Sequence, residues 1–262
     1  MKPLLKAGDL FKLYKSKFYG LKAINNHSEW FPIFASPQLA GIVADLMGDG
    51  HLQGEPKWRL DYTSKRKKEL RRFGKEIFKL FFVKGKIRPC NGNKWGTSFN
   101  YGVNCKPLAR VFYLLGVPIG RKIKKEFLIP EWILNDKECF RMFIMRLFDC
   151  EGCVSVEGSS SFISIEMWKA EEHLDNGIEF FKEIKSGLKK HFDIQTTNIF
   201  LNGVVSVKKD GSRVRGIRLR IKRFKSLVNF YKEIGFDNQQ KQNKLIKVLK
   251  IKGRGGKGQY HY

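Results

Sequence analysis

Acidic residues are scarce in this chain of 262 residues. Only 25 Asp and Glu stand against 51 Lys and Arg, which leaves a formal net charge of +26. A folded protein this basic repels itself unless a polyanion binds it. Nucleic acid is the partner class that we favour, and an anionic membrane surface comes second. Charge alone does not indicate an enzyme, because a passive RNA-binding protein would carry the same excess.

Long apolar runs are also missing, although a hydrophobic content of 42% predicts a globular protein. No segment approaches the roughly 18 apolar residues that a membrane-spanning helix needs. The first six residues lack the apolar stretch of a secretory signal. We therefore expect no membrane partner.

Cysteines are few and odd in number, namely Cys90, Cys105, Cys139, Cys150 and Cys153. This pattern favours a reducing intracellular compartment, either the cytoplasm or an organelle of the host. Cys150 and Cys153 form a C-x-x-C pair, but no second pair completes the four ligands of a structural zinc site. We interpret the cysteines as small packing residues.

The apolar periodicity predicts the same order of elements twice, which is helix, strand, strand, helix, strand, strand, helix. In the first copy, Ser36 is the expected N-cap and Pro37 the first residue of a helix that ends at Asp49-Gly50. The remaining elements of this copy are expected at 51–52, 58–63, 67–82, 86–90, 97–104 and 106–115, with a hairpin turn at Asn91-Gly92-Asn93. The second copy is expected at 137–150, 153–157, 162–168, 171–191, 199–208, 214–222 and 223–234, followed by a helix at 239–250.

Two landmarks support a true repeat. The acid-glycine pairs lie 102 positions apart, at residues 49 and 151, whereas Val103 and Ile221 are 118 positions apart. The second copy is therefore expected to have longer loops. These boundaries predict a first half at 34–120, a linker at 121–136, a second half at 137–250 and a flexible basic tail at 251–262. Residues 1–33 are basic and aromatic, and both a packed extension and a nucleic-acid-binding arm remain open for them.

Each predicted half opens with an apolar helix that ends in an acid and a glycine, Asp49-Gly50 or Glu151-Gly152. An acid is unfavourable at a helix C-terminus, where the backbone already carries partial negative charge, unless a cation lies there. Two such helices side by side would bring two carboxylates and carbonyl oxygens together, which suits Mg²⁺. Magnesium between paired carboxylates is typical of phosphodiester hydrolysis. One copy would indicate only a helix stop, whereas two copies at matching places favour a functional site.

These segments resemble the two motifs of the LAGLIDADG homing endonucleases in their single-chain form. The resemblance covers about residues 36–250. It is carried by Leu39-Ala40-Gly41 with Gly48-Asp49-Gly50, by Leu147-Phe148-Asp149-Cys150-Glu151-Gly152, and by Ile129-Pro130-Glu131-Trp132 before the second motif. It implies an α+β fold of two pseudo-symmetric αββαββα halves, each with an antiparallel sheet that forms a DNA-binding saddle.

The same resemblance implies an activity and a site. An intron-encoded monomer would cut both strands of a long asymmetric DNA site and leave short 3′ overhangs. Asp49 and Glu151 would bind two or three Mg²⁺ ions at the domain interface, with Gly48 and Cys150 beside them and with Mn²⁺ or Ca²⁺ as substitutes. Lys65 and Lys169 occupy the place where the family has a catalytic polar residue after the second strand.

Alternating polar residues along the predicted strands fit a DNA-binding face. These residues are Lys57, Arg59, Asp61 and Thr63, then Asn100 and Asn104, and finally Arg218, Arg220 and Lys222. Arg and Asn are the side chains that read guanine and adenine in the major groove. A solvated sheet face would show the same alternation, so the pattern separates the two interpretations only weakly.

Some features depart from the family pattern, and two other functions stay open. The first motif helix has the small residues Ala44 and Gly48 for close packing, whereas the second has Met145 and Arg146, so the second contact is expected to be wider or Arg146 to point away. An RNA maturase that binds its host intron would use the same scaffold, and so would a non-catalytic DNA-binding regulator. We do not expect an intein, because the chain begins without a nucleophile and ends without His-Asn.

Overall fold

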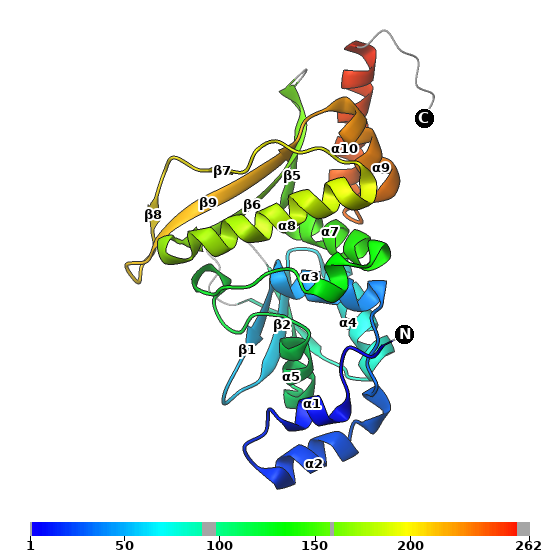
Figure 1. Cartoon of the computed structure of the whole chain (residues 1–262), viewed down its shortest axis with the longest axis vertical. Coiled ribbons are helices and arrows are strands. Elements are labelled where there is room, and N and C mark those ends of the chain that lie inside the picture. Colours follow the sequence, from blue (N-terminus) through cyan, green and yellow to red (C-terminus); the bar gives the residue numbers. More distant parts are fainter. Residues whose placement is uncertain (1, 91–97, 158–159, 256–262) are drawn as a thin grey trace. The chain divides into compact units, whose positions relative to one another are not determined.

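The computed structural model describes residues 2–90, 98–157 and 160–255. The expected Asn91-Gly92-Asn93 turn lies outside the described residues. The chain divides into two compact units, residues 1–125 with 130–139 and residues 126–129 with 140–262. Each unit has an antiparallel sheet and helices (Figure 1), so the α+β class with two similar halves is confirmed.

The first unit follows the predicted order of elements. They are α3 (Pro37–Met47), β1 (Gly50–Gln53), β2 (Arg59–Ser64), α4 (Lys67–Phe81), β3 (Lys86–Pro89), β4 (Phe99–Val103) and α5 (Lys106–Leu114), and then η2 (Lys122–Lys124) and α6 (Glu131–Leu134) in the expected linker. Ser36 caps α3, because its hydroxyl accepts a hydrogen bond from the Leu39 amide at 3.2 Å. The strands are ordered β1-β2-β4-β3 and all three pairings are antiparallel.

The second unit repeats this order with additions. Its elements are α7 (Lys137–Glu151), β5 (Gly152–Ser155), β6 (Phe162–Ala170), η4 (Glu171–His173), α8 (Leu174–Phe192), β7 (Phe200–Leu201), β8 (Ser206–Val207), β9 (Arg213–Ile221), α9 (Phe224–Glu233) and α10 (Gln239–Gly255). The sheet order is β5-β6-β9-β7, and β8 also pairs with β9. Its order β5-β6-β9-β7 therefore corresponds to β1-β2-β4-β3 of the first sheet, and β8 is an additional strand.

Two elements differ most from the prediction, whereas the other boundaries differ by at most three residues. The single strand expected at 199–208 is two short strands, β7 and β8, because the four residues 202–205 face only two residues of β9, which shifts the register by two. The helix expected at 239–250 continues to Gly255, so the first residues of the expected flexible tail are helical.

The strand register reproduces the internal repeat. In the first sheet Tyr62 pairs with Gly50 on one side and with Tyr101 on the other. In the second sheet Ile165 pairs in the same way with Gly152 and with Leu219. The spacing of 118 residues found in the sequence therefore separates equivalent positions of β4 and β9.

One long helix packs on each sheet through a glycine. A Cβ atom at Gly74 of α4 would lie 2.6 Å from the ring of Tyr101, and one at Gly177 of α8 would lie 2.3 Å from Ile217. In the first unit Phe73 stacks on Tyr62, with 4.8 Å between ring centroids. These helices cover one face of each sheet and leave the other face uncovered by helices of the same unit (Figure 1).

The N-terminal segment is packed on the first unit. It contains α1 (Ala7–Phe11), α2 (Lys17–Asn25) and η1 (Ser28–Trp30). Trp30 is buried and its indole N–H donates to the Phe81 carbonyl at 2.8 Å. The structure therefore has the packed extension that the sequence left open, with the outer face of α2 exposed. In the described part of the chain, no helix combines the length and apolarity that crossing a bilayer requires.

Asp45 places a buried negative charge in the last turn of α3, and the exposed fraction of the residue is 1%. Arg72 of α4 donates to both carboxylate oxygens, at 2.8 and 3.0 Å, and also to Glu76 at 2.9 Å. Burial opposes the charge on Arg72, but Asp45 and Glu76 outweigh it and raise the Arg72 pKa above its ordinary value. The pair fixes α3 against α4.

We predict that Asp45→Leu lowers the free energy of unfolding by about 3 kcal/mol, because it leaves the half-buried Arg72 charge poorly compensated. The double change Asp45→Leu with Arg72→Met should recover most of this loss, since the second motif helix carries Leu147 at the equivalent place. Urea unfolding followed by circular dichroism measures both. A double variant as unstable as the single one would contradict the prediction.

Candidate functional site

The two motif helices end in the same tight reversal. A Cβ atom at Gly50 would lie 2.5 Å from the Leu46 Cα, and one at Gly152 would lie 2.4 Å from the Phe148 carbonyl oxygen. Leu46 and Phe148 each precede their glycine by four residues. The fold therefore requires both glycines, because the first strand returns directly past the last helical turn.

The acids before these glycines have no such steric reason. Asp49 is exposed and Glu151 is half-buried, so neither side chain fills the core. Both lie at equivalent positions of the repeat, one residue before the glycines that pair with Tyr62 and Ile165. The helix-stop interpretation accounts for the glycines, and the repeat places one acid before each of them.

A lysine ammonium group lies at the C-terminal end of each motif helix. Lys122 of η2 donates to the carbonyls of Leu46 and Gly50, at 3.4 and 2.9 Å, and to that of Gly48. Lys241 of α10 donates to the carbonyls of Phe148 and Asp149, at 3.0 and 2.6 Å. A cation therefore occupies the negative end of both helix dipoles.

Sequence analysis missed Lys122 and Lys241 as candidate residues. They come from different elements, and nothing distinguishes them from the other 49 basic residues of the chain. The sequence did predict a cation at the end of each motif helix. That cation was expected to be a metal ion, and a lysine side chain was not considered.

The start of α10 is interlocked with the end of α7. Arg146 forms an ion pair with Asp237 at 2.9 Å, and the Asp149 carboxylate accepts from the Asp237 and Asn238 amides at 3.1 and 3.2 Å. The Asn238 side chain in turn accepts from the Lys241 amide at 3.3 Å. Within its unit Arg146 thus points to Asp237, and these contacts position Lys241.

The two lysines expected after the second strands stand at different places relative to the motif acids. Lys65 is exposed and lies two residues, or about 7 Å of extended chain, beyond Thr63, whose backbone amide donates to the Asp49 carbonyl at 3.3 Å. Lys169 is four residues beyond Ile165, the partner of Gly152, or about 13 Å. The register makes Trp168, and not Lys169, the equivalent of Lys65.

Lys169 belongs to the helix-covered side of its sheet, with an exposed fraction of 2%. Its ammonium lies 3.8 Å from the centroid of the Phe127 ring and 3.4 Å from the Asn176 side-chain oxygen. Burial lowers its pKa to about 8, although Glu126 opposes this shift. This environment gives no support to a catalytic role for Lys169 beside Glu151.

The open face of the first sheet is made of polar and basic side chains. Asp61 of β2 pairs with His51, Gly102 and, through β4, Lys86, so these residues share one side. That side also carries Gln53, Arg59, Thr63, Asn100 and Arg88, while the exposed Lys57 and Asn104 lie at its end. Arg59 is held by Asp61 at 2.6 Å, and Asn100 lies 3.4 Å from Thr63.

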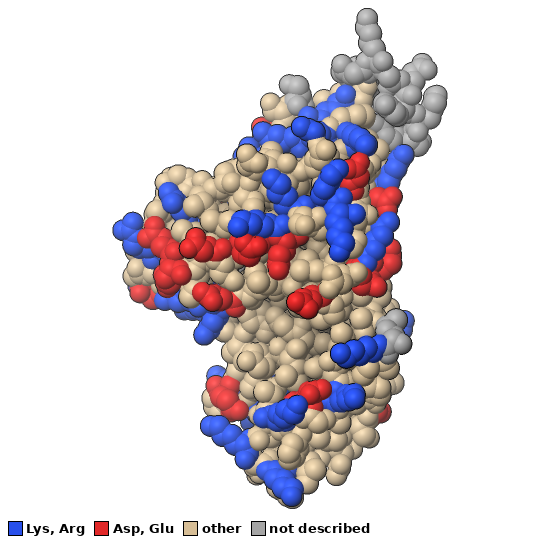
Figure 2. All heavy atoms as spheres, viewed as in Figure 1, with Lys and Arg blue, Asp and Glu red and all other residues tan. Residues whose placement is uncertain are grey.

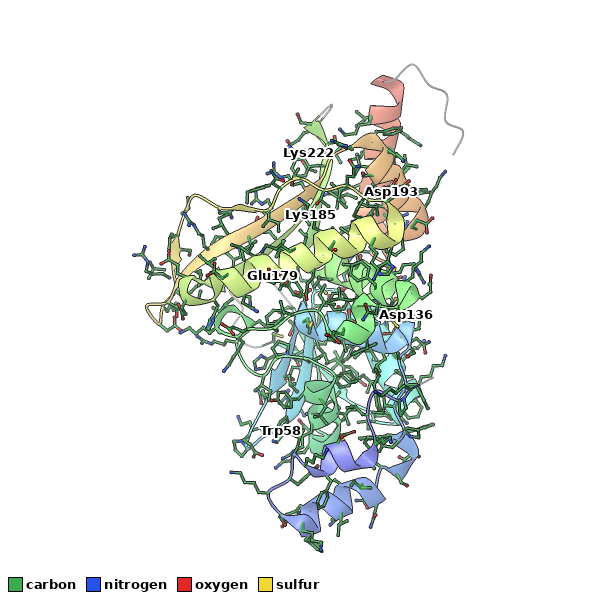
Figure 3. All side chains as sticks on the ribbon, in the orientation of Figure 1. Trp58, Asp136, Glu179, Lys185, Asp193 and Lys222 are labelled. Carbon is green, nitrogen blue, oxygen red and sulfur yellow. The ribbon has the colours of Figure 1, made fainter. Side chains whose placement is uncertain are left out.

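The open face of the second sheet is built from cations on aromatic rings. The Arg220 guanidinium lies 4.4 Å from the centroid of Phe162 and 5.0 Å from that of Phe200. Lys222, labelled in Figure 3, lies 5.8 Å from the Phe162 centroid. Arg218 is held differently, by an ion pair with Glu166.

Acidic and basic side chains lie side by side on the other side of this unit. Figure 2 shows both kinds over α8, which covers the opposite face of the same sheet and contains four lysines and three acids. The cations on the rings of the open face are the groups of this sheet that would attract an anionic ligand.

The oxygen ligands at the ends of the motif helices suit a hard cation, but those of one unit do not complete a metal site. Among the residues that the structure describes, no group of three or more His, Cys, Asp or Glu side chains is arranged to hold a metal ion. Each unit offers one carboxylate, Asp49 or Glu151, beside a helix end that already attracts cations. Oxygen ligands of this kind fit Mg²⁺, and the remaining ligands must come from elsewhere.

The chain resembles known proteins mainly in its fold. No protein-family model matches it. The tRNA-splicing ligase RtcB of Pyrococcus abyssi is 30% identical over 61% of this chain and 18% of that protein, and RtcB of Pyrococcus furiosus is 27% identical over 82% and 23%. The chain thus spans less than a quarter of the length of these curated relatives.

Two solved structures share the architecture. The homing endonuclease I-WcaI, bound to its DNA recognition sequence, aligns over 92% of this chain and 97% of its own, with a TM-score of 0.52 and 13% identity. Full-length DUF199/WhiA from Thermatoga maritima aligns over 88% of this chain and 65% of its own, with a TM-score of 0.50 and 15% identity. At such identities the likeness concerns the fold.

We predict that Gly50→Ala and Gly152→Ala each destabilise the protein by about 2 kcal/mol or more, because the new methyl group would strike backbone atoms. Gly203→Ala is the matched control, since a Cβ atom there meets nothing within 4 Å. Thermal unfolding of the three variants checks this. Equal melting temperatures for all three would show that the reversal tolerates a side chain.

The half-buried Asp149 predicts a pH dependence of stability. Burial raises its pKa to about 6, against the opposing effects of the Asn238 amide and of Lys241. A carboxyl with a higher pKa in the folded state stabilises the fold at low pH, and this contribution is lost as the pH rises through about 6. The wild-type free energy of unfolding, minus that of Asp149→Asn, should therefore fall between pH 4 and 6.

Urea unfolding at pH 4, 5, 6 and 7 measures this difference. The exposed Glu179, labelled in Figure 3, supplies the control variant Glu179→Gln. If the wild-type free energy of unfolding minus that of Asp149→Asn rises with pH, the raised pKa of Asp149 is contradicted.

Proposed function

We propose that this chain is a site-specific endonuclease that hydrolyses both strands of double-stranded DNA. The observation that carries the proposal is the pair of carboxylates, Asp49 and Glu151, each one residue before the glycine that begins the first strand of its sheet. They stand at equivalent ends of two motif helices, each beside a lysine. The likeness in fold to a homing endonuclease bound to its DNA recognition sequence supports the same function.

In this proposal the two open sheet faces bind the major groove. The first face offers amides, a hydroxyl and lysines, which hydrogen-bond bases and phosphates. On the second face Arg220 is held between two rings and is thereby oriented to read a guanine, the base that arginine recognises most often. Arg218 has Glu166 as its partner and acts as a weaker reader, because the carboxylate competes with DNA.

The carboxylates of Asp49 and Glu151 would hold the divalent ion in the proposed mechanism. A bound Mg²⁺, or Mn²⁺ or Ca²⁺ in its place, supplies Lewis-acid stabilisation of the phosphate and an activated water. Lys122 and Lys241 neutralise the helix ends and add positive charge where the DNA phosphates would approach. The Gly48 carbonyl accepts from Lys122, so we assign the metal to the carboxylates and give Gly48 and Cys150 no separate role.

DNA binding without cleavage is the second candidate. It would use the same open sheet faces and needs no metal. The fold alone does not select cleavage, because DUF199/WhiA matches it with a TM-score of 0.50, close to that of the endonuclease. In such a protein the two acids would be dispensable for every activity. We do not propose a ligase function, because the chain spans so little of the RtcB relatives. A role in RNA splicing stays a prediction for an assay with the host intron.

We predict that Asp49→Asn and Glu151→Gln each reduce double-strand cleavage by roughly 100-fold or more, because each removes one of two carboxylates around the reacting phosphate. Duplex binding should stay within a few-fold of the wild type. The target for the assay is selected by cleavage from a randomised duplex library in Mg²⁺.

Glu172→Gln, at an exposed acid of η4, is the control and should cleave normally. Wild-type cleavage by either motif variant would remove the nuclease proposal. Tight duplex binding without any cleavage by the wild type would favour the second candidate.

A further inference from the structure

A basic hollow lies at the end of the open face of the first sheet. Its volume is about 550 Å³, and Pro56, Lys57, Arg59, Asn104 and Lys106 line it. Three of these five side chains are positively charged and none is acidic. Since Arg59 is paired with Asp61, the lysines are the groups that remain to attract an anion.

The hollow is continuous with the open sheet face. The pairing of Leu60 with Val103 places Arg59 of β2 opposite Asn104, one step beyond β4. Arg59 is also opposite Gln53, which lies three residues along β1 from Gly50, or about 10 Å. A duplex that follows the open face outward from the end of α3 would therefore reach this hollow.

The N-terminal segment is fastened beside the hollow by a cation between two rings. Arg110 of α5 is buried, with its guanidinium 4.2 Å from the Tyr14 centroid and 4.4 Å from that of Trp58. It also forms an ion pair with Glu55 at 3.1 Å. Trp58, labelled in Figure 3, follows the turn between β1 and β2. This cluster ties the connection between α1 and α2 to the lip of the hollow.

Lys15 directly follows Tyr14 and is exposed, as is Lys17 at the start of α2. Because Tyr14 belongs to the Arg110 cluster, which also holds Trp58 and Glu55, Lys15 follows directly after a residue fixed beside the turn. Figure 2 shows further Lys and Arg side chains over the N-terminal helices. The cationic surface therefore continues from the hollow onto this segment.

We propose that the hollow, together with Lys15 and Lys17, binds backbone phosphates of duplex DNA that flanks the part covered by the first sheet. The inference rests on the proposed function for the identity of the polyanion. Flexible lysines on an open surface hold phosphates without reading sequence, so this surface adds affinity and register but no specificity. The packed extension would then serve the purpose of an arm without being flexible.

The test is the salt dependence of binding to a 40-base-pair duplex of random sequence, measured by fluorescence anisotropy in KCl. Log K falls as log[KCl] rises, and each lost phosphate contact makes this negative slope shallower by about 0.9. Here a lower slope means a slope of smaller magnitude. Lys57→Ala with Lys106→Ala should lower the slope by about 1 to 2, and Lys15→Ala with Lys17→Ala by a similar amount. The control, Lys75→Ala with Lys79→Ala, removes the same charge from α4 on the opposite face of the sheet and should leave the slope unchanged.

An equal change of slope in all three variants would overturn the proposal, because net charge and not this surface would then set the salt dependence. No change in any variant would also overturn it, because the duplex would then bind another surface. Displacement of the duplex by inorganic phosphate at constant ionic strength from the wild type only would identify a free-phosphate site instead. Asp49→Asn should keep the wild-type slope. Loss of cleavage capacity and loss of this phosphate surface are therefore separate outcomes, and only failure of the wild type to bind duplex would overturn both proposals.

Discussion

In both halves of the chain, the first strand leaves its motif helix so sharply that a side chain on Gly50 or Gly152 would strike the backbone of the preceding turn. This reversal fixes where the acid before each glycine can be. It also sets the register of the sheet, because the same two glycines pair with Tyr62 and Ile165. In each half, the position of the acid relative to the open sheet face thus depends on the close contact between the glycine backbone and the last turn of the motif helix.

Electrostatics add a second constraint at the same place. Carbonyl groups at a helix end attract cations, and each half satisfies them with a lysine from another element. In the second half the Arg146–Asp237 pair and the Asp149 carboxylate hold Lys241 in position. In the first half the motif helix is fixed instead by the buried pair of Asp45 and Arg72. The two halves reach the same arrangement with different residues, as expected for a degenerate repeat.

Local signals carried most of the fold prediction. The cap at Ser36, the acid-glycine stops and the alternation along the strands act within a few residues, so they could be read from the sequence. Tertiary contacts could not. The interruption at residues 202–205 depends on their register against β9, and the site lysines Lys122 and Lys241 approach the motif helices from distant elements.

The candidate site was therefore predicted only in part. Asp49 and Glu151 were predicted because the repeat makes their positions equivalent. The structure adds a steric reason for the glycine that follows each of them. Lys169 was selected by counting from Glu151, and strand register shifts that count by one residue, which turns the side chain into the hydrophobic side of the sheet. On composition alone the N-terminal segment could be a packed extension or a nucleic-acid-binding arm, and the contacts of Trp30 and of the Arg110 cluster show that it is packed.

The most direct test of the paired site is a crystal structure of the chain bound to a cleavable duplex in Mn²⁺, with anomalous scattering to locate the metal. The proposal predicts a manganese peak within about 2.5 Å of carboxylate oxygens of both Asp49 and Glu151, next to a DNA phosphate. Manganese bound away from these side chains, or two carboxylates too far apart to share one phosphodiester region, would contradict it.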